Sequence, residues 1–220
     1  MATKKDERYN GYDEIAESWY RLRHWTRFKQ ELDDMAARWG SGKLLNIGCA
    51  HGPDFLPFKD AFELYGVDSS AQMMRQALRY ASKFKFDPHL VLADAVHLPF
   101  ADHVFDYTIS IAAYHHIEGK SRREQAFAEL RRVLKPGGEA FITVWNRWQR
   151  QFWNKGKEAM VPWNTGNREV LRYYYLFTYQ EITGLLQKAG FSILKVFPEY
   201  SYKFPVKLFS KNICILARAD

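Results

Sequence analysis

Residues 43–52 read Lys-Leu-Leu-Asn-Ile-Gly-Cys-Ala-His-Gly, in which residues 43–48 are a short apolar run that ends in glycine. Such a run is typical of a buried β-strand. The two glycines, Gly48 and Gly52, allow the backbone to approach a ligand closely, and the helix expected next would offer it unpaired N–H groups. The chain has neither the Gly-x-Gly-x-x-Gly dinucleotide motif nor a P-loop at this point, so a nicotinamide-dependent oxidoreductase is disfavoured.

Strand and helix patterns alternate on both sides of this run. Further strands are expected at residues 64–67, 90–93, 105–111 and 139–145, and helices from Ser69 or Ser70 to about Phe84 and from Ser121 to Leu134. This alternation predicts an α/β fold with a Rossmann-like, doubly wound, mostly parallel sheet of seven strands. The last two strands, 192–197 and 212–217, have no helix between them and are expected to be antiparallel.

The flanking segments have patterns of their own. Two N-terminal helices are expected at 12–23 and 27–39, the second ended by Gly40. After Trp145, about 30 polar, Trp-rich residues show no regular pattern, a length that indicates a functional segment. A final helix begins at Thr178, with Glu181 placed to complete a capping box.

Acidic residues follow the second and third predicted strands. Asp68 comes twenty residues after Gly48, where a carboxylate can accept hydrogen bonds from both hydroxyls of a ribose. Asp94-Ala95 follows the third strand, where an acidic side chain can receive an adenine amino group. Each feature alone also has an ordinary explanation as a turn or a helix cap. Their order along the chain is what indicates a ligand site.

These motifs resemble those of the class I S-adenosylmethionine-dependent methyltransferases. The resemblance is carried by residues 45–52, Val67-Asp68, Ala93-Asp94-Ala95, Leu98-Pro99-Phe100 with Phe105-Asp106, and residues 134–138. It implies S-adenosylmethionine as cofactor. The residues it places at the cofactor are Asn46, Gly48, Cys49, Ala50, Gly52, Asp68, Ser69, Asp94, Ala95, Ile111 and Ala112.

Two of these positions depart from the family pattern. Asn46 stands where an acidic residue is usual, and Ala50 stands where the central glycine is usual. We expect Ala50 to keep the loop close to the cofactor if its backbone angles are ordinary. Asn46 can still accept a hydrogen bond, without the charge.

A narrower resemblance is to the methyltransferases that esterify 5-carboxymethyluridine at the wobble position of tRNA. It is carried by residues 110–116, Arg122-Arg123, residues 129–134, residues 12–16 with Arg23, Val144-Trp145, Val161-Pro162-Trp163 and residues 172–174. The Lys-Pro-Trp-Pro that follows the N-terminal arginine in that family is replaced here by Trp25-Thr26-Arg27. The chain length and the absence of an internal repeat or low-complexity linker predict a single domain, residues 1–220. Its parts are a helical cap (1–42), the cofactor-binding core (43–144), a basic Trp-rich insert that binds substrate or RNA (145–177), and a final helix with two strands (178–220).

The implied reaction makes few chemical demands on the protein. Methyl esterification is an in-line displacement at the sulfonium methyl, and a carboxylate is already ionised near neutral pH, so no strong base is required. The protein must align the reactants, exclude water and anchor the acid. The candidate catalytic residues, as holders of the carboxylate and the uridine, are Arg23, His115, His116 and Arg172. Arginine is the better carboxylate anchor because its contact is bidentate, and the His pair lacks the further ligands of a metal site, so no metal is expected.

Composition limits the class of protein. Of 220 residues, 47% are apolar and 26% are charged, which excludes extensive disorder. No apolar run reaches the roughly 18 residues of a membrane-spanning helix, and the first residues do not resemble a signal peptide. Two cysteines, Cys49 and Cys214, cannot make a disulfide framework. We therefore expect a cytoplasmic protein that does not engage a membrane.

The formal charge of +7 is unevenly distributed. Residues 1–42 and 43–144 are balanced, whereas residues 145–220 carry 12 basic and 5 acidic side chains and four of the seven tryptophans. Basic and aromatic residues together suit phosphates and unpaired bases, so we predict a surface for the anticodon loop of tRNA. Its candidate residues are Arg147, Trp148, Arg150, Trp153, Lys155, Lys157, Trp163, Arg168, Tyr173 and Tyr174.

A protein partner is also expected. The third strand would lie at a sheet edge, and Leu90-Val91-Leu92 has few of the charges that protect an edge from pairing. The family resemblance implies a small zinc-containing activator protein that adds a strand there, although an N-terminal helix could cover the edge instead. Two other functions remain open at this point. One is methyl transfer to a small-molecule, quinone or lipid acceptor, and the other is a non-catalytic RNA-binding scaffold.

Overall fold

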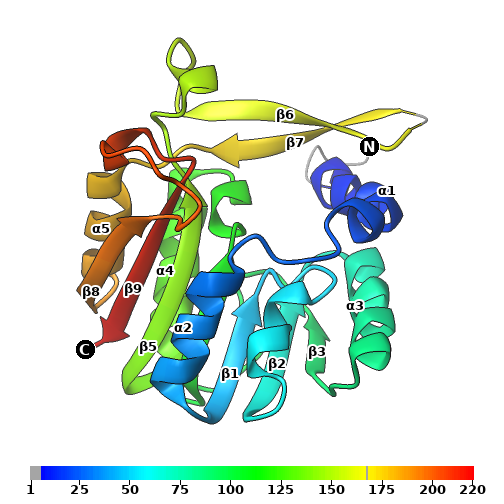
Figure 1. Cartoon of the computed structure of the whole chain (residues 1–220), viewed down its shortest axis with the longest axis vertical. Coiled ribbons are helices and arrows are strands. Elements are labelled where there is room, and N and C mark those ends of the chain that lie inside the picture. The colour runs from blue at the N-terminus through cyan, green and yellow to red at the C-terminus, as the bar shows by residue number, and fades with distance from the viewer. Residues whose placement is uncertain (1–5, 167) are drawn as a thin grey trace.

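The protein is built around a seven-stranded sheet (Figure 1), in a computed structural model that describes residues 6–166 and 168–220. The strands follow the order β3-β2-β1-β4-β5-β9-β8. Their bounds are β1 Gly42–Ile47, β2 Phe62–Asp68, β3 His89–Leu92, β4 Phe105–Ile111, β5 Leu134–Trp145, β8 Phe191–Pro198 and β9 Asn212–Ala219. Neighbours pair in parallel except for β9, which is antiparallel to both β5 and β8. The predicted doubly wound sheet is confirmed, with β3 at one edge.

The expected helices are present, and the first of them begins six residues before the position expected from the sequence. They are α1 Asp6–Leu22, α2 Lys29–Trp39, α3 Ala71–Phe84, α4 Lys120–Val133 and α5 Tyr179–Lys188. Ser70 Oγ accepts from the Met73 N–H at the start of α3, and Thr178 Oγ accepts from the Glu181 N–H at the start of α5. Glu181 does not close the predicted capping box, because its carboxylate accepts from the Tyr175 hydroxyl and pairs with a lysine instead.

The helix expected after the glycine loop is a short 3-10 helix, η1 Pro53–Phe58. Pro57 lies inside it and has no N–H to donate, so an α-helix cannot propagate through this segment. A helix therefore follows the glycine loop as expected, but as a short 3-10 segment, and its role in offering N–H groups to a ligand stays a prediction. The loop itself must supply the close approach to a ligand.

The segment after Trp145 contains a hairpin that the sequence pattern did not reveal. Strands β6 Glu158–Asn164 and β7 Glu169–Tyr175 pair in antiparallel register and lie across one end of the sheet (Figure 1). Trp163, Arg172 and Tyr174 are buried on one face, while Met160 and Leu171 are more than half exposed on the other. The alternation has the period of a strand, but a charged residue occupies its buried face, which hides the usual apolar pattern.

Helix α1 joins this hairpin to the sheet domain. The Asp13 carboxylate accepts from the Ser70 hydroxyl at 2.5 Å and from the Gln72 N–H at 3.0 Å, both at the start of α3. On the other side, Ile15 packs in one apolar cluster with Trp163 of the hairpin. Helix α1 and the hairpin together therefore form a roof over the carboxyl ends of the parallel strands (Figure 1).

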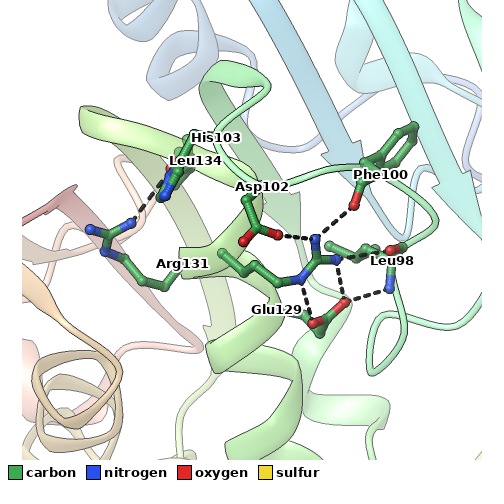
Figure 2. Close-up of polar contacts among 8 residues, drawn as sticks. Leu98, Phe100, Asp102, His103, Glu129, Arg131 and Leu134 are labelled. Carbon is green, nitrogen blue, oxygen red and sulfur yellow. Dashed lines mark hydrogen bonds and ion pairs between the residues drawn. The ribbon is translucent and has the colours of Figure 1, made fainter.

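Arg132 on α4 fixes the loop that follows β3. Its guanidinium donates to the carbonyls of Leu98 and Phe100 and pairs with the carboxylates of Glu129 and Asp102 (Figure 2). Glu129 also accepts from the Leu98 N–H at 2.8 Å. The hydrogen bonds from Arg132 lower the pKa of Glu129, which keeps this carboxylate ionised. One helix thus anchors the loop that forms part of the ligand site.

Apolar side chains cover both faces of the sheet. Phe127 and Leu130 of α4 lie in one cluster, and Leu32 of α2 lies in the other with Phe55 and Phe58 of η1. Among the residues described, no helix is both long and apolar enough to cross a membrane.

Candidate active site

A cavity of about 580 Å³ lies between the carboxyl ends of the parallel strands and the roof. Eight of the residues predicted to bind a cofactor line it: Gly48, Ala50, Asp68, Ser69, Asp94, Ala95, Ile111 and Ala112. The other three, Asn46, Cys49 and Gly52, are buried behind the described lining. Burial raises the pKa of the Cys49 thiol well above its usual value, which fits packing rather than nucleophilic chemistry.

The loop after β1 approaches its neighbours too closely for most side chains. A Cβ on Gly48 would lie 2.3 Å from Ala113 Cβ, and the φ of Gly48 is +74°. Ala50, two residues later, has a φ of +47°. The condition of ordinary backbone angles at Ala50 is therefore not met, and this left-handed conformation costs a non-glycine residue about 1 kcal/mol.

Asp68, at the end of β2, holds this loop in place. One carboxylate oxygen accepts from the Ala50 N–H at 2.8 Å, and the other accepts from the Ser70 N–H at 2.9 Å. Each oxygen retains acceptor capacity, which suits the two hydroxyls of a ribose. Burial raises the pKa of Asp68, and the backbone hydrogen bonds act in the opposite direction.

A second carboxylate, Asp94, lines the cavity where the chain leaves β3. It forms an ion pair with Arg122 at 2.6 Å and accepts from the Val96 N–H at 3.1 Å. Asp68 and Asp94 therefore present acceptors at the ends of adjacent parallel strands. A ribose diol and an exocyclic amino group are the donors that a nucleoside offers, so this part of the cavity fits the nucleoside of S-adenosylmethionine.

The roof of the cavity carries two arginines among aromatic rings. Arg172 is 6% exposed, and its Cζ lies 5.0 Å from the Trp163 ring, 5.6 Å from Trp19 and 5.2 Å from Tyr174. Arg23 Cζ lies 5.5 Å from the same Trp163 ring. Within the described part of the chain, neither arginine has a carboxylate partner, and Arg172 Nε has no hydrogen-bond partner. This end of the cavity therefore fits an anion.

His115 and His116 lie in the 3-10 helix η2 Tyr114–His116 and also line the cavity. Burial is the main cause that lowers the pKa of both rings, that of His116 to about 3, so both are neutral near pH 7. His115 Nδ1 accepts from the Trp145 N–H at 3.2 Å, and His116 Nδ1 lies 2.9 Å from the Tyr173 carbonyl. From these partners we assign the proton to Nε2 of His115 and to Nδ1 of His116.

Further cavity residues lacked a recognisable signal in the sequence. Asp54 and His51 are buried in the wall, where desolvation raises the pKa of Asp54 to about 6 and lowers the pKa of His51 to about 4. Nothing in their sequence context indicates this role. Tyr12 and Trp19 also line the cavity. Their spacing of seven residues, with Arg23 four further on, places them on one face of a helix and is a signal that could have found them.

The predicted RNA-binding residues separate into two groups. Trp163 and Tyr174 are buried and line the cavity, while Tyr173 is half-buried on β7. Exposed side chains include Trp148, Arg150, Trp153 and Lys155. Three basic residues have partners within the protein: Arg147 donates to the carbonyls of Phe152 and Lys155, Lys157 pairs with Glu181, and Arg168 pairs with Glu14.

Comparisons with known proteins agree with this geometry. Residues 45–142 match a family of methyltransferase domains. A protein of Encephalitozoon cuniculi, named as a methyltransferase candidate, is 30% identical over 182 residues, covering 79% of this chain and 80% of the relative. The chain belongs to the class I S-adenosylmethionine-dependent methyltransferases. Its cofactor is S-adenosylmethionine.

Other relatives of this methyltransferase carry more specific names. The tRNA (carboxymethyluridine(34)-5-O)-methyltransferase of Schizosaccharomyces pombe is 29% identical over 176 residues, covering 69% of this chain and 74% of that protein. The Arabidopsis thaliana protein of the same name is 32% identical over 136 residues. That match covers 61% of this chain but only 31% of the Arabidopsis protein.

Solved structures show the same fold. A methyltransferase from Clostridium acetobutylicum superposes with a TM-score of 0.74 at 16% identity, covering 94% of this chain and 98% of its own. At that identity the likeness concerns the fold alone.

Proposed function

We propose that this methyltransferase esterifies the carboxylate of 5-carboxymethyluridine at the wobble position of tRNA. The observation that carries the proposal is the pair of cavity arginines, Arg23 and Arg172, which have no carboxylate partner among the described residues. A buried cation without a counter-ion is costly unless a ligand supplies the charge. The names of the Schizosaccharomyces and Arabidopsis relatives supply the acceptor class.

The floor of the cavity would hold the cofactor. S-adenosylmethionine supplies an electrophilic methyl group when it is bound. Asp68 would accept from the ribose hydroxyls and Asp94 from the adenine amino group, while Gly48 allows the close approach of the backbone. None of these residues changes its protonation state during methyl transfer.

Arg172 and Arg23 would anchor the acceptor carboxylate. A guanidinium binds a carboxylate through two parallel N–H donors, which fixes its orientation as well as its position. Arg172 is buried among aromatic rings, so a carboxylate oxygen bound to it would be less solvated than it is in bulk solution. The carboxylate is already ionised, so this alignment replaces general base catalysis.

The two histidines would recognise the base rather than the carboxylate. Because both rings are neutral, neither attracts an anion by charge. The assigned protons leave Nε2 of His115 as a donor and Nε2 of His116 as an acceptor. A uracil offers the matching pair, a carbonyl oxygen beside an N3–H. We therefore divide the four candidate catalytic residues into two carboxylate anchors and two base-recognition residues.

Methyl transfer into tRNA tests the proposal. The protein is incubated with methyl-labelled S-adenosylmethionine and tRNA that carries unesterified 5-carboxymethyluridine, with tRNA lacking the carboxymethyl group as control. We expect label in the first tRNA only, and we expect mild alkali to release it because a methyl ester hydrolyses. Alkali-stable label would indicate a nitrogen or ribose acceptor, and the absence of transfer into either tRNA would contradict the proposal.

We also propose that β3 pairs with a small zinc-containing activator protein. β3 is the last strand at its side of the sheet, and Leu92 is 58% exposed. Helix α1 packs on α3 and the hairpin, which supports an edge that is open to a partner. An uncharged edge strand offers backbone groups for pairing.

Assembly and activity together test the partner. Co-expression with such an activator should give a one-to-one complex with higher methyl transfer than the isolated chain. Leu92→Lys should abolish the complex, whereas Leu171→Lys, on the exposed face of the hairpin, should not. A chain that is monomeric and fully active by itself would contradict this partner while leaving the proposed reaction standing.

A further inference from the structure

We infer that the protein has a two-part RNA-docking surface, formed by residues 146–157 together with residues 200–211. Its occupant is the phosphodiester backbone and unpaired bases of a tRNA anticodon stem-loop. The inference rests on the proposed tRNA substrate and adds a segment, 200–211, that lies outside the Trp-rich insert.

The charge of the molecule is concentrated in these two segments. Residues 146–157 contain four basic residues, and residues 200–211 contain Lys203, Lys207 and Lys211. Neither segment contains an acidic residue, and the seven basic side chains equal the formal excess of +7 for the whole chain. A concentration of positive charge of this kind attracts a polyanion.

Three carboxylates contact the second segment: Glu31 and Asp34 accept hydrogen bonds from Tyr200, and Glu199 accepts from the Lys211 N–H. None of the three forms an ion pair with a lysine of this segment among the described residues. Glu199, which precedes it, is 5% exposed, and its carboxylate accepts from the N–H groups of Lys211 and Asn212. Glu181 pairs with Lys157 of the first segment. Lys203, Lys207 and Lys211 are exposed, and none has an ion pair among the described residues.

The fold joins the two segments directly. The side-chain amide of Asn146 donates to the carbonyls of Leu208 and Ser210, and its own N–H donates to the Lys211 carbonyl. The rings of Trp153 and Phe209 lie 5.6 Å apart. Figure 1 shows the segment between β8 and β9 close to the chain that enters β6. The two halves are hard to connect from the sequence, because about forty residues lie between them.

Exposed aromatic rings accompany the charge. Trp153 is 49% exposed, Phe204 is 60% exposed and Trp148 and Phe209 are each 38% exposed. Unpaired bases stack on such rings whatever their sequence, while lysine and arginine meet the phosphates. Positive charge combined with exposed rings therefore fits single-stranded RNA better than an acidic protein. An acidic protein would be recognised by the positive charge alone.

The surface also reaches the cavity. Trp145 on β5 pairs with Asn212 on β9, and both residues line the cavity. One segment begins directly after Trp145, and the other ends directly before Asn212. A strand lying on both segments therefore passes the cavity rim, where a base turned out of the loop can enter.

The test removes the positive charge of residues 200–211 and leaves residues 146–157 unchanged. The triple variant Lys203→Gln, Lys207→Gln, Lys211→Gln is compared with Lys43→Gln, Lys135→Gln, Lys188→Gln, which removes the same charge at the amino ends of β1 and β5 and at the end of α5. Binding of a labelled anticodon stem-loop RNA is measured by filter binding between about 50 and 200 mM salt. Thermal stabilisation by S-adenosylmethionine verifies that both variants fold.

We expect the first triple variant to bind the RNA about ten- to a hundredfold more weakly at about 100 mM salt. The slope of its affinity against salt concentration should correspond to about two or three fewer phosphate contacts. The control should stay within about threefold of the wild type. A second variant, Phe204→Ala with Phe209→Ala, should lose about tenfold in affinity with an unchanged salt dependence.

Equal RNA affinity in the two triple variants would overturn the inference. The docking surface would then be assigned to an acidic protein partner instead of RNA. If the wild type esterifies tRNA while the triple variants bind it equally, only the docking surface is contradicted. If the wild type transfers no methyl group to tRNA, the proposed function itself fails.

Discussion

Arg23 and Arg172 stand against the same indole ring, that of Trp163, with their Cζ atoms 5.5 Å and 5.0 Å from its centroid. One arginine follows α1 and the other lies on β7, so the two come from opposite sides of the roof. Like charges held at one ring repel each other, and an anion between them removes that repulsion. This arrangement supports the proposal that the pair forms half of a carboxylate site.

Replacing Arg172 tests this directly. Lysine keeps the charge but loses the bidentate fork, so Arg172→Lys should lower kcat/KM for tRNA carboxymethyluridine about a hundredfold, or about 2.7 kcal/mol. Binding of S-adenosylmethionine, measured by calorimetry, should stay unchanged. Arg123→Lys is the matched control, because Arg123 is also 6% exposed, stacks on Tyr175 and lies away from the described cavity lining. Loss of cofactor affinity in Arg172→Lys would instead assign Arg172 to the carboxylate of the cofactor.

Asp68 should control the affinity for the cofactor. Asp68→Asn replaces one charged acceptor by an amide donor, so the Kd for S-adenosylmethionine should rise at least about tenfold. Asp106→Asn is the control. Asp106 also accepts a backbone N–H, from Lys43 at 2.9 Å, but it lies at the amino end of the sheet near Lys135. Equal affinities of the two variants in calorimetry would exclude the ribose contact.

Ala50→Gly should be nearly neutral for stability. Glycine relieves a left-handed strain of about 1 kcal/mol but adds about as much backbone entropy to the unfolded chain. Ala128→Gly, at an exposed position inside α4, has no strain to relieve and should cost about 1 kcal/mol. Urea unfolding of both variants compares the two positions. A loss as large at Ala50 as at Ala128 would show that the positive φ carries no strain.

Asp54 makes stability depend on pH. Its pKa is about 6 in the folded protein, against an ordinary value of 3.8 that applies when the chain is unfolded. The native form therefore binds more protons between these values, and stability falls as pH rises through them. Asp54→Asn removes this dependence. The unfolding free energy of Asp54→Asn should exceed that of the wild type by about 2–3 kcal/mol at about pH 8 and by almost nothing at about pH 4. A constant difference across this range would show that Asp54 is not the group responsible.

The sequence predicted the sheet well because its strands are buried on both faces. Largely apolar runs such as residues 44–48 are typical of such a layer, and Ser70 and Gly40 mark helix ends by local chemistry alone. These signals do not depend on distant residues. The parallel core, its antiparallel strand and the edge position of β3 were therefore predictable.

The roof was not predictable for the opposite reason. The buried faces of β6 and β7 cover a cavity rather than a core, so Arg172 occupies a position where an aliphatic residue would reveal a strand. Likewise, the environment of Asp54 depends on contacts with Thr26, which lies in another part of the chain. The same holds for Ala50, whose φ is set by the loop and its bond to Asp68.

The pairing of Trp145 with Asn212 separates the molecule into parts that can be exchanged independently. Of the residues described as lining the cavity, none lies within 146–157 or 200–211, although both segments start from this one pair. Replacing only residues 146–157 and 200–211 by the corresponding segments of another methyltransferase would change the outer surface while leaving the donor site and the arginines in place. The junction is thus a natural boundary for engineering acceptor choice in this fold.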